Sequence, residues 1–136
     1  VLPANYRMGQ QEFNNYAGFI LHEVGHPLFT DNGVWNVAVR LGRARLLNAL
    51  EDVRIERRII ETNIAANGLN VLAALCHQLD VKVLGGKFDP NDPKNIGFVM
   101  GYLGRCANGY SLDARLITNS LRPGSASHRG TRDYGT

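Results

Sequence analysis

The segment QQEFNNYAGFILHEVGHPLF, residues 10–29, has a periodic pattern of apolar residues. Its apolar side chains recur at the steps of three and four that place them on one side of a helix. These side chains are Phe13, Ala17, Ile20, Leu21, Val24 and Leu28. The turn signal Asp31-Asn32-Gly33 follows. The pattern therefore predicts a helix over 10–29.

The remaining segments also predict helices, so the fold class is mostly α with little sheet. A long helical pattern covers 34–66, where Gly42 bends or divides it and Asn67-Gly68 is the stop signal. Residues 69–79 predict a third helix, and 81–84 a short strand or connector. Residues 87–94 predict a loop, and 95–107 and 112–121 two further helices. We expect the helix over 10–29 to pack on the long second helix.

Length and composition indicate one globular domain. The 136 residues, 44% of them hydrophobic and 20% charged, suit a single core over 1–122, followed by a flexible tail over 123–136 that is rich in Gly, Ser and Arg. The chain begins at Val1, and we expect it to be part of a longer protein. No apolar run is long enough for a membrane span. The net charge of +3 does not by itself indicate a nucleic-acid partner.

Within the first predicted helix, His22-Glu23-Val24-Gly25-His26 is an H-E-x-x-H motif. Residues four apart lie on the same side of a helix, so both imidazoles can reach one zinc ion. Glu23, about 100° round the helix from His22, can touch a water on that zinc and is the candidate general base. Zinc lowers the pKa of such a water and polarises a carbonyl oxygen. The motif predicts a metal site with a catalytic Glu23.

The acids in NALEDVRIE, residues 48–56, are candidates for the third zinc ligand. Glu51 and Asp52 are about 100° apart on a helix, so both cannot point equally well at one ion. Asn48, Asp52 and Glu56 share a face at steps of four. We therefore favour Asp52 over Glu51 as the ligand. Glu56 and Asn48 are expected beside it, with Glu56 holding the second N–H of a histidine.

Two features leave alternatives open at this site. Pro27 directly follows His26, and proline removes an amide donor and disfavours helix at the residue before it. The helix is therefore expected either to bend and re-aim His26 or to end there. The histidines can also be ordinary helix-face residues that touch water or a carbonyl. The acids can form ordinary pairs with Arg45, Arg57 and Arg58.

The segments H-E-V-G-H (22–26) and L-E-D-V-R-I-E (50–56) together resemble a known family. They are similar to metallopeptidase-like domains that precede von Willebrand factor A (VWA) modules in bacterial and phage proteins, of the kind seen in the large subunit of cobaltochelatase. The wider group is the zincins, and the resemblance covers roughly residues 2–61. It implies zinc at His22 and His26, an acid from Glu51-Asp52, and Glu23 as base. Pro27 departs from the aliphatic residue expected there.

The resemblance implies a zinc-dependent metallopeptidase that acts on a peptide or protein substrate, with an AAA+ ATPase as a possible partner. The alternative is a metal-stabilised, non-catalytic interaction domain of a VWA–AAA+ machine or of a phage system. A third reading, less favoured, is a phage structural or nucleic-acid-associated module that uses the arginine-rich helix. Two cysteines without C-x-x-C spacing favour reduced thiols. We therefore expect a cytoplasmic protein, and the resemblance implies the cytoplasm of a bacterium or of a phage-infected cell.

Overall fold

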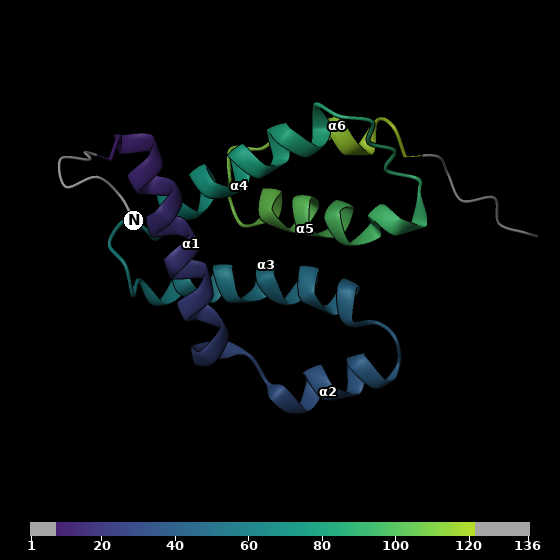
Figure 1. The fold of residues 1–136 in the computed structure, drawn as a ribbon, viewed down its shortest axis with the longest axis horizontal. Helices are drawn as coiled ribbons and strands as arrows, with labels where there is room; N and C mark the ends of the chain where they lie inside the picture. The colour runs from purple at the N-terminus through teal and green to yellow at the C-terminus, as the bar shows by residue number, and fades with distance from the viewer. Residues whose placement is uncertain (1–7, 122–136) are drawn as a thin grey trace, which may run out of the picture.

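The computed structural model describes residues 8–121, which form six α-helices and one 3-10 turn and contain no strand (Figure 1). In chain order these are α1 (Gln10–Phe29), α2 (Asn32–Arg40), α3 (Ala44–Thr62), α4 (Gly68–Leu84), η1 (Pro93–Asn95), α5 (Ile96–Ala107) and α6 (Arg115–Thr118). The mostly α prediction is confirmed, while the tail predicted over 123–136 lies outside the described residues. None of the described helices combines the length and the hydropathy that a bilayer crossing requires.

Helix α1 spans the predicted residues and continues through Pro27. The proline lies inside the helix, which ends two residues later where the N–H of Thr30 donates to the carbonyl of His26. Proline has no N–H to donate to the carbonyl four residues earlier, so one backbone bond of the last turns is missing. The alternative in which the helix ends at His26 is therefore wrong, and both histidines belong to one continuous helix.

The long helix predicted over 34–66 is divided into two at Gly42. Asp31 caps the start of α2 by accepting hydrogen bonds from the N–H groups of Gly33 and Val34. Gly42 has a φ of +64°, a conformation that glycine adopts without the steric cost of a Cβ. Helix α3 ends at Thr62, where Asn63 is left-handed with a φ of 50°. The predicted stop at Asn67-Gly68 is wrong, because Asn67 instead precedes the first residue of α4.

Two other predicted boundaries are corrected. Residues 81–84 are the last turn of α4, so the strand or connector predicted there is wrong. Leu84 packs against the buried cluster of Val99, Tyr102 and Ile117, a contact that accounts for the helix continuing. The helix predicted over 112–121 shortens to the single turn of α6.

Close approach of α1 to two neighbouring helices positions the motif. A Cβ at Gly18 would clash with the carbonyl oxygen of Val71 on α4. A Cβ at Gly25 would lie 2.7 Å from Cδ1 of Ile59, a residue of α3 that is completely buried. Helix α1 therefore packs against α4 and α3, and α3 packs along α5 (Figure 1). Gly25 stands between the two histidines of the motif, so the contact at Ile59 holds their face of α1 against α3.

Candidate metal centre

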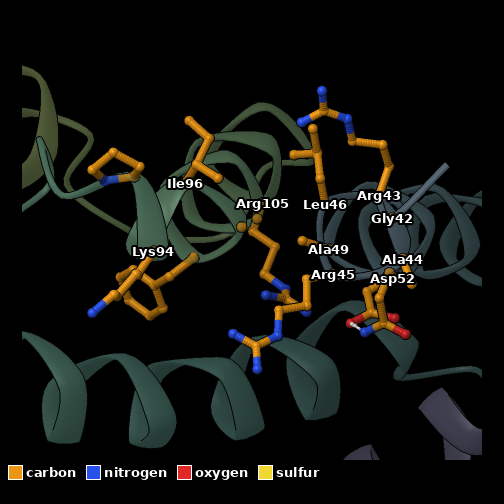
Figure 2. A pocket seen from close by; sticks show the side chains of 15 residues that line it. Gly42, Arg43, Ala44, Arg45, Leu46, Ala49, Asp52, Lys94, Ile96 and Arg105 are labelled. Atoms are coloured by element: carbon orange, nitrogen blue, oxygen red, sulfur yellow. Dashed lines mark hydrogen bonds between the residues drawn. The ribbon is translucent and has the colours of Figure 1, made fainter. Parts of the chain in front are cut away.

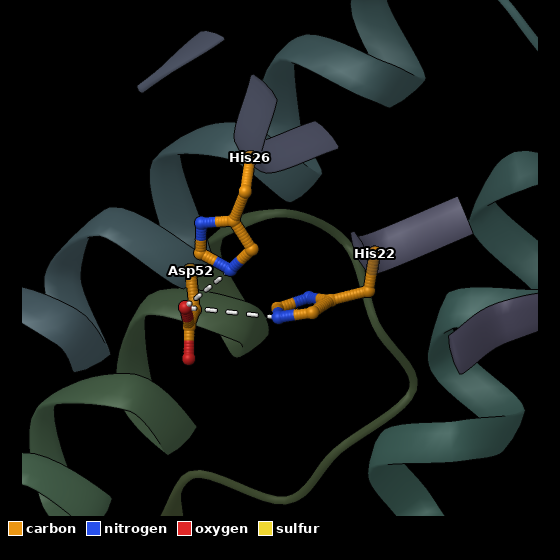
Figure 3. A group of neighbouring side chains, drawn as sticks. All are labelled: His22, His26 and Asp52. Atoms are coloured by element: carbon orange, nitrogen blue, oxygen red, sulfur yellow. Dashed lines mark ion pairs between the residues drawn. The ribbon is translucent and has the colours of Figure 1, made fainter. Parts of the chain in front are cut away.

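His22 and His26 of α1 and Asp52 of α3 converge at one point (Figure 3). One potential ligand atom from each of these half-buried residues lies within 4.8 Å of the other two. The Oδ1 atom of Asp52 lies 3.7 Å from Nε2 of His22 and 3.5 Å from Nε2 of His26. The two rings meet edge to face with centroids 5.0 Å apart. Spacing by one helical turn therefore brings both Nε2 atoms to the same carboxylate oxygen.

The oxygen of Asp52 that faces the histidines lacks a hydrogen-bond donor. Oδ2 accepts a bond of 3.2 Å from the side-chain amide of Asn48, whereas Oδ1 is buried and accepts no hydrogen bond from any described residue. Burial raises the pKa of Asp52, although His22, Arg105 and His26 act against this. A buried carboxylate oxygen without a donor is costly, and a bound cation would remove that cost. The group is thus incomplete in a way that a metal ion would complete.

The separations fit zinc. Ligand atoms about 2.0–2.2 Å from a tetrahedral zinc lie roughly 3.4 Å from one another. The two observed distances between Nε2 and Oδ1, 3.7 and 3.5 Å, are close to that value and too long for ordinary hydrogen bonds. Two imidazole nitrogens and one carboxylate oxygen are also a donor set that zinc accepts. The residues present therefore fit the metal predicted from the sequence, and metal binding itself stays a prediction.

Glu56, one turn after Asp52, is the completely partnered acid of the centre. Its carboxylate lies 3.1 Å from Nδ1 of His22, receives two bonds from Arg105 at 2.9 and 2.7 Å, and accepts a bond of 2.8 Å from the hydroxyl of Tyr110. Burial alone would raise the pKa of Glu56, but these hydrogen bonds and the Arg105 charge lower it to about 2. Glu56 is therefore a fixed anion in the interior.

The anion determines how His22 is held. The hydrogen bond to Glu56 raises the pKa of His22 against the opposing effect of burial. Because Glu56 can only accept, Nδ1 of His22 carries the hydrogen, and in the neutral ring Nε2 is left with a lone pair towards Asp52. On His26, Nδ1 lies 3.3 Å from the hydroxyl of Thr30 and Nε2 again faces Asp52. Both imidazoles are thus oriented with the same nitrogen towards the group.

Glu51, the other candidate ligand, is held by Arg54 and is not one of the three residues that converge. Its carboxylate accepts bonds of 2.7 and 2.6 Å from Arg54, which also donates to the carbonyl of Phe29. The hydrogen bond from Arg54 lowers the pKa of Glu51. The structure therefore places Asp52, and not Glu51, beside His22 and His26, in agreement with the helical-angle argument.

Glu23, the predicted base, is exposed on α1 next to His22. It is not among the three residues that converge, and none of the hydrogen bonds or ion pairs found within residues 8–121 involves it. Its side chain is open to solvent. The catalytic role of Glu23 stays a prediction.

The sequence analysis did not predict the roles of two residues that hold Glu56. Arg105 was not identified, although it is the one charged side chain in the apolar helix IGFVMGYLGRCA, and that isolation is the signal that pointed to it. Tyr110 is buried and its hydroxyl donates to Glu56.

A cavity of about 700 Å³ opens beside Asp52, between the beginnings of α3 and α5 (Figure 2). Arg45 and Arg105 both extend into the space between these two helices (Figure 2). The cavity gives the candidate centre an open side that a ligand of several residues can occupy.

Comparison of the chain with protein-family models, with curated proteins and with solved structures returned no match. The resemblance to metallopeptidase-like domains rests on the residues of 22–26 and 50–56 alone.

Proposed function

We propose that this chain is a zinc-dependent hydrolase of peptide bonds, with the metal held by His22, His26 and Asp52. The observation that carries the proposal is the convergence of two Nε2 atoms on a buried carboxylate oxygen that has no hydrogen-bond donor. Three protein ligands with an open fourth position are typical of catalytic zinc sites, whereas structural sites have four. The open cavity beside Asp52 supports the same reading.

Bound zinc would supply a Lewis acid and a water of lowered pKa. The chain's own residues would do the rest. Glu56 keeps the hydrogen of His22 on Nδ1, and Arg105 and Tyr110 keep Glu56 ionised and in place. Glu23, exposed next to His22, would accept a proton from the attacking water and return it to the leaving amine.

A second candidate is a metal-stabilised interaction domain without turnover, such as a scaffold in an AAA+ ATPase and VWA assembly. The observation that favours it is the lack of any bond that orients Glu23 among the described residues, because a general base normally needs a fixed geometry. Either function would suit a reducing cytoplasm, where the free thiols of Cys76 and Cys106 would persist.

The variant Glu23→Gln separates these two functions. Zinc content and casein hydrolysis would be measured on the zinc-loaded chain, with Glu12→Gln, on the same helix, as the matched control. We expect Glu23→Gln to keep its zinc and to lose about 100-fold or more of the hydrolysis. Undiminished hydrolysis would refute the enzyme proposal. Zinc binding without hydrolysis by the unchanged chain would favour the scaffold.

A further inference from the structure

The cavity beside the candidate centre is strongly basic. Its walls carry four cationic side chains, Arg43, Arg45, Lys94 and Arg105, against a single acid, Asp52. Arg105 is committed to Glu56 by two hydrogen bonds. The other three cations are exposed, and no ion pair found within residues 8–121 includes them. The cavity therefore has an excess of positive charge directly next to the proposed metal.

The backbone adds charge of the same sign. The first turns of α3 and α5 both line the cavity, through Ala44 and Arg45 on one side and Ile96 and Gly97 on the other. Helix α3 has no side-chain cap on its first N–H groups, whereas α5 continues from η1 and the N–H of Ile96 donates to the carbonyl of Pro93. Free N–H groups at a helix start attract anions. The start of α3 and three exposed cations thus face one space, whose walls also include the apolar side chains of Leu46 and Phe98.

We propose that this cavity is the subsite for a carboxylate of the substrate, so that the proposed peptidase prefers peptides with an acidic side chain or a free C-terminus near the scissile bond. The inference rests on the proposed function for the identity of the ligand as a peptide. A carboxylate can accept from a guanidinium and from helix N–H groups at once, and the apolar walls suit the adjoining peptide.

The remaining arginines of α3 argue against a nucleic acid as the occupant. Arg54 pairs with Glu51, and Arg57 and Arg58 both pair with Glu61. The arginine-rich helix is therefore largely neutralised outside the cavity, whereas a nucleic acid requires a continuous basic surface along its backbone. Free positive charge concentrated in one cavity suits a small anionic group.

The test measures binding rather than turnover. Three rhodamine-labelled peptides of matched sequence would be titrated by anisotropy. One has acidic side chains and an amidated end, one has the corresponding amides and an amidated end, and one has the amides and a free C-terminus. We expect the first or the third to bind about fivefold or more tightly than the second, and the preferred one identifies the source of the carboxylate. Added salt should weaken that preference.

Substitutions test which side chains cause the preference for a peptide with a carboxylate. Arg45→Gln and Lys94→Gln should each reduce it about threefold or more. Arg40→Gln, at the end of α2 and outside the cavity, should change it by less than about twofold, because a distant exposed charge is screened. Equal affinities for the three peptides, or equal effects of all three substitutions, would overturn the proposal. Tighter binding of a single-stranded oligonucleotide that depends on Arg45 would also overturn it.

Repeating the titration after zinc removal separates this inference from the proposed function. The basic side chains do not depend on the metal, so the preference should persist in the chelated chain. A retained preference in a chain that never binds zinc would support the subsite and refute the metal centre. A zinc-binding chain that shows no preference would refute the subsite alone.

Discussion

Two buried carboxylates, Glu56 on α3 and Asp80 on α4, have opposite surroundings. Glu56 is 1% exposed and receives hydrogen bonds from three side chains, and its pKa falls to about 2. Asp80 is 5% exposed, its Oδ2 has no donor among the described residues, and burial raises its pKa to about 6. Similar burial thus gives one permanent anion and one acid that resists ionisation.

Hydrogen-bond donors, and not burial, therefore decide whether these interior acids stay charged. Arg105 contributes to both, but it donates directly to Glu56 and acts on Asp80 only through its charge. Three donors gathered around Glu56 indicate a group built to remain ionised against His22. Asp80 receives no comparable support, and its burial is a cost that the fold carries.

Of the substitutions at these two acids, Glu56→Gln is expected to have the larger effect on stability. The change keeps the shape of the side chain but leaves Arg105 without its counter-charge in the interior. We expect a loss of about 3–5 kcal/mol in the free energy of unfolding at pH 7, measured by urea denaturation of the metal-free chain. Glu61→Gln, at an exposed position on the same helix, should have a much smaller effect, because water screens the pairs of Glu61 with Arg57 and Arg58.

The pH dependence of this stability loss tests whether it is caused by the ionised carboxylate of Glu56. The pKa of Glu56 is lowered on folding, from 4.5 to about 2, so its contribution is complete above pH 4.5 and is lost as the pH falls towards 2. The difference in the free energy of unfolding between the unchanged chain and Glu56→Gln should therefore become smaller in acid. A gap that is small at pH 7, or constant down to pH 2, would contradict the account.

Asp80→Asn should have a smaller effect of the opposite sign. The pKa of Asp80 is raised on folding, from 3.8 to about 6, so the folded chain holds its proton more tightly and loses stability as the pH rises through this range. Removing the charge should stabilise the chain by on the order of 1–2 kcal/mol at pH 7, with no gain below about pH 4. Thermal unfolding at several pH values measures this. A loss of stability at pH 7 would show that Asp80 has a partner as effective as those of Glu56.

Much of the centre followed from helical spacing. The step of four between His22 and His26 predicted their convergence, and the steps of four through Asn48, Asp52 and Glu56 favoured Asp52 over Glu51. Such predictions depend only on residues within one helix, where geometry is fixed by local sequence. The packing of α1 on α3 then needed one further assumption, that the motif faces the neighbouring helix.

The rest depended on contacts between distant parts of the chain. Arg105 and Tyr110 reach Glu56 across 49 and 54 residues of sequence, and no periodicity links such positions. The ends of some helices were predicted wrongly for the same reason. Residues 81–84 have strand-like composition, yet the packing of Leu84 in a separate cluster accompanies their helical form. Gly42 is the counterexample, since its positive φ is a local property that sequence can suggest.

The most direct test of the central claim is the zinc affinity of three proteins, measured by competition with a chromophoric chelator and checked by elemental analysis. We expect one zinc per chain for the unchanged protein, and an affinity about tenfold or more weaker for Asp52→Ala. Glu51→Ala, which removes the neighbouring acid held by Arg54, should bind zinc as tightly as the unchanged chain. Absence of zinc from the unchanged chain, or a loss in Glu51→Ala with none in Asp52→Ala, would contradict the account.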